Sequence, residues 1–258
     1  MKLEGACVVV TGGAGGIGKA LARRFLQEGA RAVVVSDVAK DALDAVAAEI
    51  GATAIACDVR DEDAIRALID ATEAEHGPID LFCSNAGVAV LGGVDAPLDA
   101  WQLSFDVNIH AHIKTARILV PRMLERGGGY LLQTASAAGL LTQLGSAPYA
   151  VTKHAAVAFA EFLAITYGDR GLKVSVLAPQ AVRTAMTAGV PGGGVAGVDG
   201  MLEPDDVAGV VVEGLDAERF LILPHPQVLD YLRRKADDYD RWIAGMRRLQ
   251  TRYQYPDS

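Results

Sequence analysis

The stretch Cys7-Val8-Val9-Val10-Thr11-Gly12-Gly13-Ala14-Gly15-Gly16-Ile17-Gly18 decides the fold of this chain. Its apolar, β-branched start is typical of a strand that is buried on both faces of a parallel sheet. The glycines that follow allow a tight turn and let backbone amides approach a pyrophosphate at the positive end of a helix. The stretch therefore predicts a strand, a phosphate-binding turn and a helix that begins near Ile17.

An acidic residue after the next predicted strand fits a nucleotide site. Residues 32–36 read as a strand and lead into Asp37, whose carboxylate can accept hydrogen bonds from adenosine ribose hydroxyls and would repel a 2′-phosphate. Val38 is not the basic residue that would favour a 2′-phosphate, so we expect NAD rather than NADP. Lys19 could pair with a phosphate, but we interpret it as a solvated helix residue. A glycine-rich turn with a surface aspartate behind it is the plainer alternative.

Strands and helices alternate along the whole sequence. We expect strands at 6–10, 32–36, 53–57, 80–84, 129–134, 173–178 and 219–223, and helices at 17–28, 40–49, 62–76, 99–126, 149–168, 204–216 and 226–249. This alternation predicts an α/β fold in which a doubly wound, seven-stranded parallel sheet carries helices on both faces. Ligands of such sheets bind beyond the carboxyl ends of the strands. No repeat or linker divides the chain, so residues 1–258 are expected to form one domain.

The composition narrows the class of protein. With 258 residues, of which 51% are hydrophobic, the chain can bury a large core, and its net charge of −8 argues against a nucleic-acid partner. No charged-then-apolar leader and no apolar run approaching twenty residues are seen, so we expect no membrane span and a cytoplasmic location. Cys7, Cys57 and Cys83 read as small buried residues, and no metal cluster is predicted.

Ser136, Tyr149 and Lys153 follow the spacing Ser-x12-Tyr-x3-Lys. Tyr149 and Lys153 are an i, i+4 pair, so their side chains emerge on one face of a helix. An ammonium near a phenol favours the phenolate and lowers a pKa that starts near ~10, which makes the tyrosine a general base or acid close to neutral pH. Chance supplies many such pairs, so the spacing gains weight only from the nucleotide-binding start.

Together, these and several further motifs resemble the short-chain dehydrogenase/reductase family over roughly residues 3–224. The residues that carry the resemblance are TGGAGGIG, Asp58-Val59, Ser84-Asn85-Ala86-Gly87, Asn108, Ser136, Tyr149, Lys153 and Pro179 through Thr184. The resemblance implies a Rossmann-type fold, a nicotinamide cofactor and the transfer of a hydride to or from an alcohol carbon.

The resemblance also implies a set of cofactor contacts. These are Gly12, Gly15, Gly16, Ile17 and Gly18 at the pyrophosphate, Asp37 at the ribose, Asp58 and Val59 at the adenine, Asn85, Ala86 and Gly87 beside the sugar, Lys153 at the nicotinamide ribose, Tyr149 beside it, and Pro179, Val182 and Thr184 at the carboxamide and phosphates. The chain departs from the family pattern at Ser84, where an asparagine is usual, and at Gln180, where a glycine is usual. The longer Gln180 side chain could point toward the substrate.

Four residues receive catalytic roles from the resemblance. Ser136 is expected to hydrogen-bond the substrate oxygen, and Tyr149 to take the hydroxyl proton in oxidation or donate it in reduction. Lys153 is expected to favour the phenolate, and Asn108 to anchor a water that relays protons. The plainer alternatives are a turn cap for Ser136, a buried polar bridge for Asn108 and interface packing for Tyr149. We expect His110, His112 and His154 to be structural.

The substrate is only broadly defined. Residues 185–202 contain six glycines and read as a mobile lid over the site. The expected lining is apolar and consists of Ala138, Leu140, Leu141, Leu144, Met186, Val190, Val195 and Met201. We expect Ser136, Ala138, Gln180 and Met186 to touch an apolar secondary alcohol or ketone. A steroid, a terpenoid, an aryl alkyl carbinol and a fatty 3-hydroxyacyl group fit equally well, and Arg183 could clamp a carboxylate.

The tail, residues 225–258, is expected to be a helical extension. An apolar stripe is formed by Leu229, Leu232, Ala236, Tyr239, Ile243 and Met246. It predicts packing on the same subunit or a neighbour in preference to a membrane surface, because acids interrupt its basic face. The family resemblance implies a homo-oligomer, a tetramer built through helices 99–126 and 149–168, with a tail that could cover a partner's active site.

Two functions remain open at this stage. The first is an NAD-dependent dehydrogenase that acts on an apolar secondary alcohol. The second is a catalytically silent NAD-binding sensor or scaffold of the same fold. The intact set of Asn108, Ser136, Tyr149 and Lys153 favours the enzyme.

Overall fold

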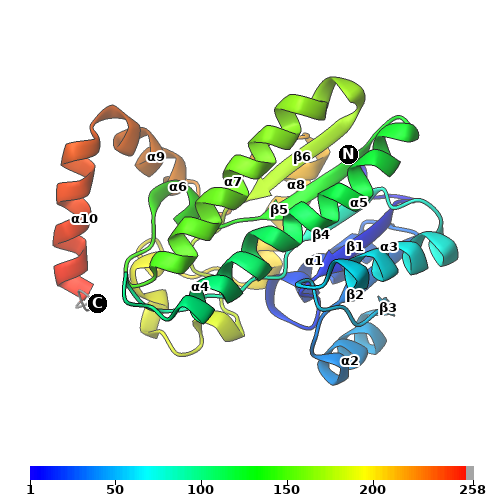
Figure 1. The fold of residues 1–258 in the computed structure, drawn as a ribbon, viewed down its shortest axis with the longest axis horizontal. Helices are drawn as coiled ribbons and strands as arrows, with labels where there is room; N and C mark the ends of the chain where they lie inside the picture. Colours follow the sequence, from blue (N-terminus) through cyan, green and yellow to red (C-terminus); the bar gives the residue numbers. More distant parts are fainter. Residues whose placement is uncertain (254–258) are drawn as a thin grey trace.

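A computed structural model describes residues 1–253; the end of the expected tail, residues 254–258, lies outside the described residues. Within the described part, seven parallel strands form one sheet in the order β3-β2-β1-β4-β5-β6-β7 (Figure 1). The strands are β1 (Cys7–Thr11), β2 (Ala32–Ser36), β3 (Thr53–Ala54), β4 (Leu81–Ser84), β5 (Gly129–Thr134), β6 (Leu172–Leu177) and β7 (Leu221–Ile222). The predicted seven-stranded Rossmann-type fold is confirmed, although the two edge strands, β3 and β7, are shorter than expected.

Helices cover both faces of the sheet. They are α1 (Gly16–Gln27), α2 (Lys40–Ile50), α3 (Glu62–His76), α4 (Leu98–Phe105), α5 (Ala111–Glu125), α6 (Ala138–Leu141), α7 (Ala147–Tyr167), α8 (Pro204–Asp216), α9 (Gln227–Asp237) and α10 (Tyr239–Tyr253). Side chains of α1, α2 and α8 share one apolar core with the sheet, and those of α3, α5 and α7 share the other. The buried valine runs of β1 and β2 supply both cores, because alternate residues of a strand point to opposite faces.

The strand order reverses beside β1. Val8 to Val10 pair with Val33 to Val35 of β2 on one side and with Leu81 to Cys83 of β4 on the other. From β1, the chain first builds outward through β2 and β3 on one side. It then builds outward in the opposite direction from β4 to β7. In doubly wound sheets, the carboxyl ends of the strands at this point form the ligand site. The glycine loop after β1 lies there.

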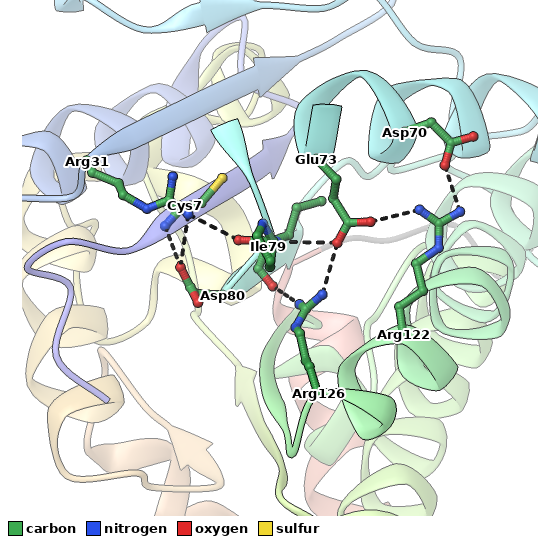
Figure 2. A network of polar contacts seen from close by, with 9 residues as sticks. Cys7, Arg31, Asp70, Glu73, Ile79, Asp80, Arg122 and Arg126 are labelled. Atoms are coloured by element: carbon green, nitrogen blue, oxygen red, sulfur yellow. Dashed lines mark hydrogen bonds and ion pairs between the residues drawn. The ribbon is translucent and has the colours of Figure 1, made fainter. Parts of the chain in front are cut away.

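A charged network ties α3 to α5 and to the start of β4 (Figure 2). Glu73 of α3 accepts hydrogen bonds from Arg122 and Arg126, at 2.8 Å and 3.0 Å. Nearby, the Asp80 carboxylate accepts the Cys7 backbone N–H at 2.7 Å. Burial raises the pKa of Glu73, but the hydrogen bonds from the two arginines lower it more, so its pKa lies below the usual value. The network holds α5 against the sheet.

The helix predicted over residues 99–126 is not a regular α-helix. It consists of α4, a π-helical turn η1 (Asp106–His110) and α5. A π turn inserts one extra residue per turn, and such turns are frequent at functional sites. Here the π turn carries Asn108, which is fully buried. Helix α6 was not predicted, because four residues are too short for a periodic pattern.

The tail forms two helices, so the single helix predicted over residues 226–249 is wrong. Asp238 between α9 and α10 is extended, and its carboxylate accepts the backbone N–H of Arg241 at 2.9 Å, which caps the start of α10. The predicted stripe is broken as a result. Leu229, Tyr239 and Ile243 are exposed, whereas Val228 is buried and packs with Leu141 of the same chain. In Figure 1 the two helices extend outward from the end of the domain near α6.

Candidate active site

The glycine loop leads directly from β1 into α1. Gly12 and Gly16 have positive φ values of 67° and 53°, and a Cβ on Gly18 would lie 2.1 Å from the Gly12 carbonyl oxygen. A side chain would be strained by the positive φ at Gly12 and Gly16, and at Gly18 it would collide with the backbone. A Cβ on Gly15, in contrast, would meet nothing within 4 Å. The loop is therefore tightly packed at Gly12 and Gly18, and there is open space beside Gly15.

The start of α1 is suited to an anion. Its N-cap residue, Gly15, has no side chain to cap the first N–H groups of the helix, so those at Gly16, Ile17 and Gly18 lack a side-chain cap. Thr184 lies against this turn, because a Cβ on Gly16 would be 3.0 Å from the Thr184 methyl carbon. The open space at Gly15 and the uncapped amides fit the pyrophosphate of a dinucleotide. The loop after β6, with Thr184, lies within reach of the same group.

Asp37 lies at the end of β2, beside the glycine loop. One carboxylate oxygen accepts the backbone N–H of Ala14 at 3.2 Å, and the other accepts that of Ala39 at 3.1 Å. These bonds fix the carboxylate where the sequence places a ribose contact. The neighbouring Val38 side chain is 66% exposed and brings no positive charge.

The polar side chains among the expected cofactor contacts that follow β3 and β4 already bind other groups of the protein. Asp58 forms an ion pair with Arg60 at 2.6 Å, and the hydrogen bond from Arg60 lowers the pKa of Asp58. Val59 is buried. The Asn85 side chain donates to the Thr11 carbonyl at 3.0 Å and accepts from the Thr134 hydroxyl at 3.1 Å. Asn85 thus joins three strands through its side chain.

This loop is positioned by two threonines that received no role from the sequence. The Thr11 hydroxyl accepts the backbone N–H groups of Asn85 and Ala86, at 3.0 Å and 3.1 Å. The Thr134 hydroxyl binds Asn85, and the Thr134 carbonyl binds Lys153. Both threonines end strands at the carboxyl edge of the sheet, and this position is the signal that could have found them.

Ser136, Tyr149 and Lys153 are brought together beyond the end of β5. Ser146 caps the start of α7 by accepting the Tyr149 backbone N–H at 3.3 Å, which orients the helix that carries the tyrosine. The Ser136 hydroxyl lies close enough to Tyr149 to lower the pKa of the phenol, and the Lys153 ammonium lies 5.6 Å from the centre of the Tyr149 ring. The three side chains therefore form one cluster, as their spacing predicts.

Burial dominates the electrostatics of this cluster. It raises the pKa of Tyr149, which the Ser136 hydroxyl only partly offsets, and it lowers the pKa of Lys153 to about 8. The expected lowering of the Tyr149 pKa is thus wrong for this arrangement. The reason is that the low-dielectric interior disfavours both charges, and the Lys153 ammonium donates to the Thr134 carbonyl at 3.0 Å.

Asn108 is a structural clamp for the loop that follows β4. Its side-chain oxygen accepts the Val88 backbone N–H at 2.9 Å, and its amide donates to the Val88 carbonyl at 2.9 Å and to the Thr152 hydroxyl at 3.1 Å. A Cβ on Gly87 would lie 3.4 Å from both the Asn108 oxygen and the Lys153 nitrogen. Asn108 therefore lies near Lys153, and both polar atoms of its side chain make hydrogen bonds within the protein.

The segment after β6 closes one side of the cluster. The Pro179 carbonyl accepts the Ser136 hydroxyl at 3.4 Å and the Ala137 backbone N–H at 2.8 Å. The Gln180 backbone N–H donates to the His225 ring at 3.2 Å. Gln180 thus follows the residue that binds Ser136, while Ala138 is buried and Met186 is 48% exposed.

The expected lid, residues 185–202, folds into short turns around the same segment. It contains the helical turns η3 (Ala185–Thr187) and η4 (Pro191–Gly197). Ala181 donates to the Ala196 carbonyl at 2.9 Å and accepts from the Leu202 backbone at 3.2 Å, and Val182 is buried. The Tyr231 hydroxyl of the tail donates to Asp199 at 2.9 Å. The tail of the same chain therefore contacts the expected lid.

Within residues 1–253, no group of three or more His, Cys, Asp or Glu side chains is placed to hold a metal ion. No helix there is both long and apolar enough to cross a bilayer.

Comparisons with known proteins agree on one family. Residues 6–192 match the family model described as short chain dehydrogenase. The chain is 40% identical to 1-deoxy-11-beta-hydroxypentalenate dehydrogenase of Streptomyces exfoliatus, over 95% of this chain and 92% of the relative. It is 35% identical to meso-2,3-butanediol dehydrogenase of Serratia marcescens, over 74% and 77%. A crystal structure of a short chain dehydrogenase/reductase from Burkholderia phymatum in complex with NAD superposes with a TM-score of 0.85, at 28% identity, over 93% and 96% of the two chains.

Proposed function

This chain belongs to the short-chain dehydrogenase/reductase family, and from that premise we propose that it oxidises an apolar secondary alcohol, or reduces the matching ketone, with NAD. Its relatives are oxidoreductases that act on hydroxyl or ketone groups. The observation that carries the proposal is the buried cluster of Ser136, Tyr149 and Lys153 beside the open glycine loop.

The preference for NAD rests on Asp37 and Val38. The Asp37 carboxylate is fixed beside the glycine loop, where it would accept ribose hydroxyls and repel a 2′-phosphate. Val38 offers no cation for that phosphate. The NAD complex of the Burkholderia phymatum structure supports the same choice. Gly15, Gly16, Ile17 and Thr184 would hold the pyrophosphate.

Each catalytic side chain has one task in this proposal. A bound nicotinamide supplies or accepts the hydride. Ser136 hydrogen-bonds the substrate oxygen and orients it toward Tyr149. Tyr149 donates a proton to that oxygen in reduction and takes it back in oxidation, while the Lys153 charge favours the phenolate. Because burial raises the pKa of Tyr149 and oxidation needs the phenolate, we expect the rate of alcohol oxidation to increase as the pH rises.

The substrate is proposed to be a bulky apolar alcohol. Ala137 and Leu141 are buried in the small core between α6 and the tail, and Met186 and Val190 of the expected lid are partly exposed. The match to 1-deoxy-11-beta-hydroxypentalenate dehydrogenase covers 95% of this chain, so 1-deoxy-11-beta-hydroxypentalenate is the first compound to test.

A homotetramer is proposed on the basis of α5 and α7. A groove of about 560 Å³ runs between them, lined mostly by apolar residues such as Val120, Leu124 and Leu163. Phe162 also lines the groove and is 54% exposed, and Ile165 of the same helix is 83% exposed. Large apolar side chains exposed together are typical of an interface.

A test of the function measures absorbance at 340 nm with a panel of terpene alcohols, steroids, aryl carbinols and hydroxyacyl thioesters, using wild type and Tyr149→Phe. We expect turnover by wild type and a loss of about 10²–10⁴-fold in Tyr149→Phe. NAD binding should be retained in the variant, because the ring remains. Undiminished turnover by Tyr149→Phe would refute the mechanism, and inertness of wild type with NAD binding intact would favour the sensor or scaffold.

A further inference from the structure

Three buried polar residues form a cluster that the proposed mechanism does not use. They are Ser84 of β4, His112 of α5 and Gln133 of β5, with exposed fractions of 4%, 1% and 0%. Five of their side-chain atoms have no hydrogen-bond partner: the Ser84 hydroxyl oxygen, both ring nitrogens of His112, and the amide nitrogen and oxygen of Gln133. We call these three residues the buried polar cluster.

The sheet places the cluster on the face that α5 and α7 cover. Ser84 and Gln133 are register partners on the neighbouring strands β4 and β5. Each follows by two residues a side chain of the core under those helices, Phe82 and Leu131 respectively. Since alternate residues of a strand share a face, Ser84 and Gln133 point toward α5, where His112 is buried. Gln133 is close enough to the His112 ring to raise its pKa, although no hydrogen bond of normal geometry joins them.

Lys153 lies next to the cluster. Its ammonium donates to the carbonyl of Thr134, the residue after Gln133. Burial, and then the charge of Lys153, lower the pKa of His112 to about 3, so the ring is neutral at physiological pH. The titratable groups that face Lys153 are Tyr149 of its own helix and His112 of α5. In η1, Asp106 and His110 pair with each other at 2.9 Å instead, and β5 and α6 bring no ionisable side chain to this face.

Five unpaired polar atoms on adjoining buried residues call for a shared partner. A buried polar atom without a hydrogen bond costs about 1–3 kcal/mol. Buried waters typically make about three hydrogen bonds to such atoms. A hydroxyl, an imidazole and an amide supply both donors and acceptors, and a water can use either.

We propose that Ser84, His112 and Gln133 enclose a buried water beneath Lys153, and that His112 and Gln133 act through this water as positioning residues that keep Lys153 in its ammonium form. A water that is oriented by neutral His112 and Gln133 can turn its oxygen toward the Lys153 ammonium. A positively charged His112 would instead repel the ammonium. The ammonium then favours the Tyr149 phenolate. This consequence for catalysis rests on the proposed function, but the water site and the charge of Lys153 do not.

The experiment replaces the polar groups by apolar ones of similar size, in the double variant His112→Val/Gln133→Leu and in His112→Val alone. Lys153 is followed by ¹³C NMR of lysine labelled at Cε, in a Tyr149→Phe background so that the tyrosine does not titrate. We expect the midpoint of the Lys153 titration to fall by about one pH unit. A shift of that size corresponds to the loss of one hydrogen bond to a charged group. The midpoint of alcohol oxidation, measured with Tyr149 present, should rise by a similar amount.

Leu131→Val is the matched control, because it creates a small cavity on the same strand and face but removes no polar atom. It should lower stability and leave the Lys153 midpoint unchanged. His112→Asn, which retains a polar side chain, should restore most of the wild-type midpoint. A crystal structure of the wild type should show the water within hydrogen-bond distance of His112 and Gln133.

Two results would overturn the proposal. One is a Lys153 midpoint in His112→Val and in the double variant that matches the Leu131→Val control. The other is a crystal structure in which His112 bonds directly to Gln133 with no water between them. If wild type proves inactive on every substrate, the NMR titration and the crystal structure still decide the matter, so failure of the proposed function is distinguishable from failure of this inference.

Discussion

The Asp37 carboxylate accepts a hydrogen bond from the backbone N–H of Ala14 at 3.2 Å, which joins the end of β2 to the glycine loop. The bond makes Asp37 part of the loop's architecture as well as a candidate ribose contact. Its charge is fixed in place and does not need to be ordered when a cofactor binds. A selectivity based on repulsion is strongest with such a fixed charge.

Asp37→Ala should therefore weaken NAD binding and strengthen NADP binding. We expect at least a tenfold loss for NAD, since hydrogen bonds to a charged group contribute about 1.5–3 kcal/mol. Calorimetric titration with both cofactors measures it. Asp41→Ala, an exposed acid in the first turn of α2, is the control and should change neither affinity. Tighter NADP than NAD binding by wild type would contradict the assignment.

Lys153→Met should stabilise the protein while it abolishes catalysis. The pKa of Lys153 is lowered by burial from 10.5 to about 8, so below pH 8 the folded state carries the cost of a buried charge. One pKa unit corresponds to about 1.4 kcal/mol. We therefore expect the free energy of unfolding at pH 7 to rise by roughly 2 kcal/mol, after allowing for the unpaired Thr134 carbonyl.

The sign of the pH dependence gives a sharper check of that variant. Between about pH 8 and 10.5 the unfolded state binds more protons than the folded state, so Lys153 makes wild-type stability rise with pH there. In Lys153→Met this rise should be absent, and the advantage of the variant should shrink with increasing pH. Urea denaturation at pH 7 and pH 10 measures both. Equal stabilities at pH 7 would show that the ammonium is not destabilising.

Glu73→Gln should loosen the attachment of α5 to the sheet. The folded-state pKa of Glu73 is lowered, so its stabilising effect is full above the unfolded pKa, near ~4.3, and is lost as the pH falls through the folded value. We expect a loss of about 2 kcal/mol at pH 7 in urea denaturation, and a smaller difference from wild type at pH 4.

Glu62→Gln is the matched control for Glu73→Gln. Glu62 lies on the same helix but pairs with Arg66 at 3.5 Å on the exposed side. Exposed pairs contribute about 0–1 kcal/mol. An effect of Glu62→Gln as large as that of Glu73→Gln would mean that the network in Figure 2 adds no particular stability.

Ile165→Glu should disrupt the proposed tetramer. Ile165 is 83% exposed on α7 of the single chain, and burying a carboxylate there in an interface is costly. Light scattering should give a mass of four chains for wild type and a smaller one for the variant. Val94→Glu, at a position 91% exposed in the loop before α4, is the control and should leave the mass unchanged. A wild-type mass of one chain would refute the interface.

Sequence alone was sufficient for the fold and for the candidate catalytic set. The run from Cys7 to Gly18 is informative because a buried parallel strand, a turn with positive φ and a helix start each restrict residue type locally. The Tyr149 and Lys153 pairing follows from helical periodicity alone. Such features depend on neighbours within a few positions, so they can be read along the chain.

Tertiary structure decided what depends on burial and on distant partners. The Asn85 side chain is hydrogen-bonded to Thr11 and Thr134, which lie on other strands and are distant from Asn85 in the sequence. The pKa of Tyr149 is raised instead of lowered because the whole fold removes water from it. Asp238 breaks the tail by capping α10, although the apolar pattern continues across it.

The buried polar cluster also depends on residues that are distant in the sequence. In the sequence, Ser84, His112 and Gln133 lie in three different elements, and no periodicity links them. Only strand register and helix packing bring them under Lys153. The sequence by itself thus determined the sheet, the glycine loop and the choice of candidate catalytic side chains. The tertiary structure determined their charges and supports, because desolvation and hydrogen bonding are set by all the elements that surround a group.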